Sequence, residues 1–70
     1  QPLTAKRLIA ILLAHGFILT RLSGSHHIFH NPVSGATVPV PVHGKNRPLF
    51  IGTFMEIVKQ SKLSKETFEK

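Results

Sequence analysis

Hydrophobic residues near the amino end recur with the period of an α-helix. Apolar side chains at positions 8, 9, 12 and 13 form one stripe, and Thr4 stands where a helix needs an N-cap residue. Gly16 follows the last periodic position, as is common where a helix ends in a left-handed conformation. The pattern therefore predicts a helix from Ala5 to about His15 that packs through its apolar stripe.

The middle of the chain has the composition of short strands separated by turns. Residues 17–22 are rich in β-forming side chains and end at the small residues 23–25. A second strand is expected over residues 26–30, where two sets of side chains alternate, and residues 31–35 carry strong turn chemistry. A third strand is expected over residues 36–42.

Prolines distinguish the third strand from the other two. Val38, Val40 and Val42 share one face, whereas Pro39 and Pro41 cannot donate ladder hydrogen bonds. Such a strand is tolerated at the edge of a sheet. We therefore expect an edge strand whose free side is available to a partner's strand or to a bound ligand.

The last third of the sequence carries helix-start signals. Thr53 and Glu56 have the spacing of a capping box, which predicts a second helix that begins near Phe54. Ser64 is placed to cap a short last turn or helix that runs to the end of the sequence. The order is α-β-β-β-α, an α+β fold with a three-stranded antiparallel sheet and helices on one face. We expect residues 1–70 to form a single domain, because so short a chain buries only about 60% of its unfolded surface.

Charge indicates the kind of partner. Nine Lys and Arg residues against three Glu leave a net charge of +6, which attracts polyanions. Nucleic acid or an acidic protein is the expected partner, and a membrane is not, because the basic residues are scattered along the chain. The apolar run at positions 8–13 is far shorter than the roughly 20 residues that span a bilayer. The absence of cysteine favours a cytoplasmic location.

Histidines are concentrated around the second strand. His26, His27 and His30 lie close together in the sequence, and His43 follows the third strand. Strand alternation places His26 and His30 on one face, and His27 with Phe29 on the other. Three interpretations compete for this cluster: a metal site, structural roles, and acid–base chemistry.

Metal binding and purely structural roles are the first two interpretations. His26 and His30 have a familiar ligand spacing, but on a strand they lie about 13 Å apart, too far for one zinc ion. His26 with His43 is geometrically possible, yet no Cys or Asp and few Glu are available to complete the shell. We therefore expect no metal site. For His15, His27 and His30, half-exposed structural positions are the expected role.

The third interpretation makes His26 a general acid or base. Imidazole suits this role because its unperturbed pKa of about 6.5 lies near neutral pH. The small residues Gly24 and Ser25 would let a phosphate approach closely and would offer N–H donors. These are the parts needed for RNA cleavage by the ribose 2′-hydroxyl, which requires neither a metal, a cofactor nor a protein nucleophile.

At these residues the chain resembles the HicA (YcfA-like) family of bacterial toxins. The family's mark is a Gly-Ser-His-x-x-Phe run after a helix and a strand, which stands here as residues 24–29. The resemblance continues through Asn31-Pro32, the Val-Pro-Val-Pro-Val-His-Gly segment at residues 38–44, and Gly52-Thr53-Phe54. It therefore covers nearly the whole chain.

The resemblance implies a fold similar to the double-stranded-RNA-binding domain, a toxin that cleaves mRNA, and a HicB antitoxin that covers its site. By the same resemblance, His26 is the catalytic histidine because it directly follows Gly-Ser, and Gly24 and Ser25 also match. Basic side chains near that histidine are candidates to hold RNA phosphates, namely Arg21, Lys45 and Arg47.

Two other function classes remain open on the residues alone. The first is an RNA-binding module without catalysis, since a fold does not fix a function. The second is a protein-interaction domain, in which the positive charge complements an acidic partner and the edge strand docks it. An assay with RNA in EDTA distinguishes the three function classes. A nuclease cleaves the RNA, an RNA-binding module retains it without cleavage, and a protein-interaction domain shows no affinity for it.

Overall fold

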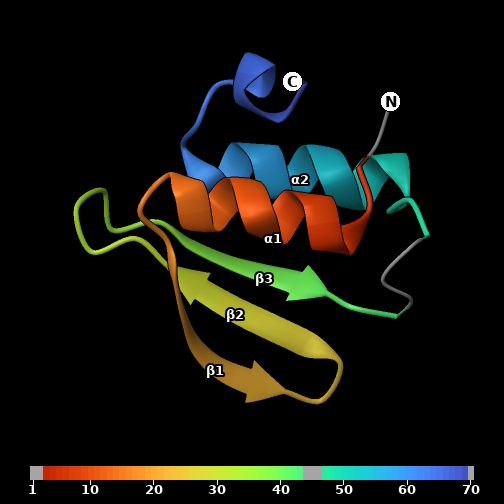
Figure 1. Ribbon diagram of the computed structural model, residues 1–70, viewed down its shortest axis with the longest axis horizontal. Helices are drawn as coiled ribbons and strands as arrows, with labels where there is room; N and C mark the ends of the chain where they lie inside the picture. The colour runs from red at the N-terminus through yellow and green to blue at the C-terminus, as the bar shows by residue number, and fades with distance from the viewer. Residues whose placement is uncertain (1–2, 44–46, 70) are drawn as a thin grey trace.

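The computed structural model describes residues 3–43 and 47–69. Its elements confirm the expected α-β-β-β-α order of a small α+β fold with an open three-stranded sheet. Figure 1 shows the helices beside β3, with β1 the strand farthest from them. The elements are α1 (Ala5–Ala14), β1 (Ile18–Ser23), β2 (His26–His30), β3 (Thr37–Pro41), α2 (Ile51–Ser61) and the 3-10 helix η1 (Lys65–Phe68).

Both ends of α1 agree with the sequence signals. Thr4 Oγ1 accepts a hydrogen bond of 3.2 Å from the Arg7 backbone N–H, as an N-cap does. Gly16 has a φ of 91°, and the backbone N–H of the next residue, Phe17, bonds back to Leu12 O at 3.0 Å. The expectation that Leu13 joins the apolar stripe is wrong, because it is 52% exposed. The helix contacts β3 and η1, so the flank that carries Leu13 remains uncovered.

The sheet has the order β1-β2-β3, with antiparallel pairing throughout. Phe29 lies opposite Val38 and both are buried, whereas His26 lies opposite Pro41 on the other face. The alternation expected for residues 26–30 is therefore confirmed, and so is the position of β3 at an edge. Phe17, expected to open the first strand, precedes β1 and is buried in the core.

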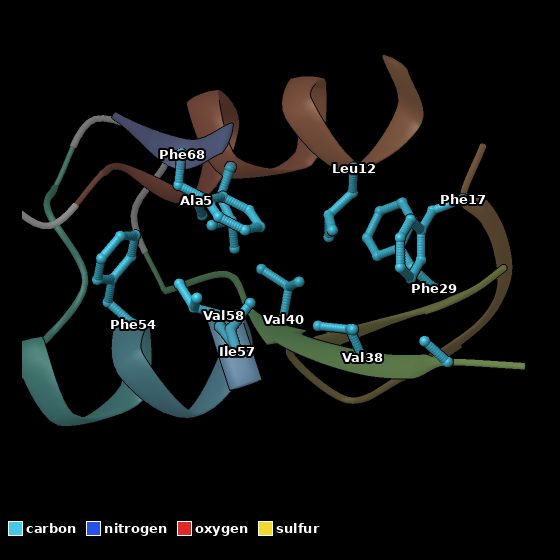
Figure 2. Packing of buried hydrophobic residues seen from close by; sticks show 12 residues of the cluster. Ala5, Leu12, Phe17, Phe29, Val38, Val40, Phe54, Ile57, Val58 and Phe68 are labelled. Carbon is cyan, nitrogen blue, oxygen red and sulfur yellow. The ribbon is translucent and has the colours of Figure 1, made fainter. Parts of the chain in front are cut away.

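The core lies between the helices and one face of the sheet (Figure 2). Leu12 packs beside Phe17 and Phe29 at one end. At the other end, the rings of Phe54 and Phe68 meet edge to face at 6.2 Å. The buried apolar residues are Ala5, Leu8, Leu12, Phe17, Phe29, Ala36, Val38, Val40, Phe54, Ile57, Val58 and Phe68.

The second helix begins earlier than its capping-box signal predicts. α2 starts at Ile51, so Thr53 lies inside the first turn and forms no N-cap. The chain just before the helix is held by a bond of 3.0 Å from Leu49 N–H to Leu3 O, and Phe54 N–H already bonds to Phe50 O at 2.9 Å. Backbone pairing with the amino-terminal segment thus holds the chain immediately before the helix, a long-range contact that the local capping-box pattern does not reflect.

The carboxy-terminal segment is a single short turn, as expected. Ser64 occupies the N-cap position of η1, but its hydroxyl lies 3.0 Å from Thr67 Oγ1 and caps no backbone N–H. Phe68 anchors the turn in the core with no exposed surface. In the described parts of the chain, no helix is long and apolar enough to cross a membrane.

Asn31 joins α1 to the turn between β2 and β3. Its Nδ2 donates to the backbone oxygen of His15 at 3.1 Å, and its Oδ1 accepts from Val33 N–H at 2.9 Å. The side chain is only 8% exposed, so these bonds replace water that it has lost. The residue pattern predicted a turn here, but the hydrogen bond from Asn31 to the end of α1 could not be predicted from it.

Replacing Asn31 by Ala should lower the free energy of unfolding by about 2 kcal/mol, because the substitution removes two part-buried side-chain hydrogen bonds that each contribute about 1 kcal/mol. Chemical denaturation followed by circular dichroism measures the loss. Val33→Ala is the matched control in the same turn, since Val33 is 95% exposed and should unfold like the wild type. Equal denaturation midpoints for Asn31→Ala and the control would contradict this role.

Candidate active site

A tight turn places His26 at the end of the β1–β2 hairpin. Ser23 pairs with His26, so only Gly24 and Ser25 connect the strands. Gly24 has a φ of 60°, which favours glycine at the first central position of a type II′ turn. A Cβ built at Gly24 meets nothing within 4 Å, so the surface above this turn is open to a ligand.

His26 lies on the sheet face that points away from the buried core. It is exposed and lies opposite Pro41 of β3. The ring of His43 lies 6.4 Å from the His26 ring, centroid to centroid, at an interplanar angle of 83°. Within residues 3–43 and 47–69, no hydrogen bond holds the His26 ring, so both ring nitrogens are available to a ligand.

A pocket of about 640 Å³ opens beside these two histidines. It lies between β3 and α2, which pack against each other. Among the described residues, Arg47 and Glu56 are the charged ones in its wall, and prolines with other apolar side chains make up much of the rest. The lining residues are His26, Pro39, Pro41, His43, Arg47, Pro48, Leu49, Phe50, Gly52, Thr53, Glu56, Ile57 and Gln60.

The two prolines of β3 stand where they cost no hydrogen bonds to β2. Asn31 N–H bonds to Ala36 O at 2.9 Å, and Val42 N–H bonds to Ser25 O at 2.8 Å. Because bonded positions alternate, the nitrogens of Pro39 and Pro41 point to the free edge. That edge lacks donors at both positions, which disfavours the expected pairing with a partner's strand. Both prolines instead line the pocket.

The structure brings some of the predicted site residues together. Arg47 lines the pocket with His26, and Ser25 directly precedes His26. Arg21 is exposed and lies opposite Ile28, on the same open face of the sheet as His26, but it does not line the pocket. Lys45 lies outside the described residues.

The other histidines have surroundings that separate them from His26. His15 Nδ1 lies 2.9 Å from Ile11 O, and His30 Nδ1 lies 2.9 Å from Thr37 Oγ1. The structural roles expected for these two residues agree with those contacts. His27 is half-buried on the core side of the sheet, and its buried Nδ1 has no hydrogen-bond partner in the described part of the chain.

The sequence suggested only one specific role for His43, as a possible metal ligand together with His26. The two rings do approach each other, as strand pairing allowed. Among the described residues, however, no group of three or more His, Cys, Asp or Glu side chains could hold a metal ion. The position of His43 after the strand that pairs with β2 could have suggested that it belongs to the site. Its closeness to His26, however, depends on the register of β2 against β3.

Comparison with known proteins assigns the chain to a family. The family model described as the HicA toxin of bacterial toxin–antitoxin systems matches residues 5–63, which is most of the chain. The protein therefore belongs to the HicA toxin family. None of the curated proteins compared with this sequence matches it.

Proposed function

We propose that this protein is a metal-independent endoribonuclease that cleaves mRNA, with His26 as its catalytic residue. The observation that carries the proposal is the exposed, unbonded ring of His26, which follows an open Gly24-Ser25 turn and faces a pocket containing Arg47. Membership of a toxin family supports an activity that damages the cell. A cytoplasmic site of action follows, because mRNA is the substrate.

The chemistry uses the ribose 2′-hydroxyl as its nucleophile. The 2′-oxygen forms a bond to the adjacent phosphorus and the 5′-oxygen of the next nucleotide leaves, so the protein needs only to move protons and stabilise charge. His26 moves one of these protons. The backbone at Gly24 and Ser25 is available to approach a phosphate, because no side chain covers Gly24.

Basic side chains on the same face would hold the RNA backbone. Arg47 lies in the pocket wall, and Arg21 extends the positive surface along β1. Lys45 belongs to the same proposed set by its position in the sequence. Such contacts neutralise phosphates, so affinity for RNA should fall as salt concentration rises.

His26→Ala should reduce the rate of RNA cleavage by at least about 100-fold, because a positioned acid or base contributes roughly that much or more. Cleavage of a labelled RNA in EDTA measures the rate, and circular dichroism should show an intact fold, since the side chain is exposed. His15→Ala is the matched control: it also removes an exposed imidazole, but one outside the pocket. A His26→Ala protein that cleaves at the wild-type rate would end the assignment.

The same assay separates the other function classes. A net charge of +6, with Arg21 exposed on the open face and Arg47 exposed in the pocket wall, also suits an RNA-binding module without catalysis. That alternative predicts intact RNA that is retained in a gel shift. A protein-interaction domain predicts no RNA affinity even at low salt.

A HicB-like antitoxin is the proposed protein partner. Membership of the HicA toxin family supports the pairing, and the positive charge suits an acidic partner. Leu19 and Leu22 of β1 are 47% and 63% exposed, so the protein also presents apolar surface that a partner can cover.

Co-expression with the adjacent open reading frame should therefore restore growth, and the two proteins should purify together. Colony counts and affinity purification of the tagged toxin measure the two effects. A frame-shifted copy of the neighbouring gene is the control. Continued growth arrest, with both intact proteins present in soluble form, would refute the pairing.

A further inference from the structure

A second imidazole lies at the site that the proposed function assigns to His26. The His43 ring faces His26 edge to face at 6.4 Å, and both side chains line the same pocket. His43 is exposed, so neither burial in the core nor a hydrogen bond from the described residues explains its position. Both imidazoles can therefore contact a ligand that enters this pocket.

Backbone pairing holds the two histidines in this arrangement. Val42 N–H donates to Ser25 O at 2.8 Å, which joins the residue before His43 to the residue before His26. This hydrogen bond extends the β2–β3 ladder by one position beyond its last pair, His26 with Pro41. A ladder bond of this kind fixes the backbone positions from which both rings enter the pocket, and such a fixed backbone favours catalysis.

We propose that His43 is a second catalytic residue that forms an acid–base pair with His26; this inference rests on the proposed RNA-cleaving function. A centroid separation of 6.4 Å is too long for a hydrogen bond between the rings, and it is short enough for both rings to reach one ligand in the shared pocket. Each ring nitrogen needs to come within roughly 3 Å of the oxygen that it serves. The two oxygens are the 2′-hydroxyl and the 5′-oxygen on the two sides of one phosphorus.

The proton transfers balance without any co-reactant. The neutral imidazole takes the proton of the 2′-hydroxyl as the 2′-oxygen–phosphorus bond forms. The imidazolium of the other histidine gives its proton to the 5′-oxygen as the phosphorus–5′-oxygen bond breaks. The products are a 2′,3′-cyclic phosphate and a 5′-hydroxyl, and exchange with water returns both rings to their starting states.

Arginine side chains near the pair are suited to hold a phosphate. Arg47 precedes α2 and supplies a positive charge in the pocket wall, whereas Glu56 of α2 supplies a negative one. Arg21 of β1 lies on the same open face of the sheet, farther along the hairpin. Arg47 can stabilise the charge on the phosphate.

The test compares wild type, His26→Ala, His43→Ala and His43→Gln in EDTA, with His15→Ala as control. The wild type should give a bell-shaped dependence of kcat on pH, because one histidine must be neutral and the other protonated. Each His43 variant should lower kcat by about 100-fold or more. Each His43 variant should also lose one limb of the bell-shaped pH dependence of kcat. Its affinity for RNA should stay within about threefold of the wild-type affinity.

The outcomes separate the two proposals. If the wild type cleaves, His26→Ala is inactive, and the His43 variants keep the wild-type kcat and both limbs, then the acid–base pair is wrong and the endoribonuclease stands. Loss of RNA affinity with unchanged kcat would also overturn the pair, because it would make His43 a binding residue. A wild type that does not cleave RNA would overturn both proposals.

Discussion

The register of β2 against β3 is the constraint on which the site depends. Phe29 and Val38 lie opposite each other and are buried, so the alternation of side chains places His26 on the opposite face. A slip by one residue would expose Phe29 and turn His26 toward the core, at a cost of about 2 to 3 kcal/mol for the phenylalanine alone. Packing of the core therefore also positions the catalytic candidate.

The same register explains why the pocket forms at an edge of the sheet. Pro39 and Pro41 keep the ladder to β2 intact because their nitrogens point away from it, and they leave the outer edge short of donors. α2 packs against this edge strand and completes the pocket with Glu56 and Gln60. Secondary structure thus supplies most of the wall, while the open Gly24 turn leaves an approach to His26.

Much of this arrangement could be predicted from local patterns. The alternation in residues 26–30, the prolines of the edge strand and the cap at Thr4 each act within a few residues, and the structure confirms the elements that they predict. The long-range features could not be predicted in the same way. The approach of His43 to His26 depends on strand pairing across a turn, and the bond that holds the chain before α2 joins Leu49 to Leu3, far away in the sequence.

Analysis of the RNA ends tests the central claim most directly, because it reports the reaction path itself. RNA cleaved by the purified protein in EDTA should carry a 2′,3′-cyclic phosphate on the upstream fragment and a 5′-hydroxyl on the downstream fragment. These ends follow from attack by the ribose 2′-hydroxyl with proton transfer by histidine. Fragments with 3′-hydroxyl and 5′-phosphate ends, or cleavage that requires a divalent ion, would contradict the account.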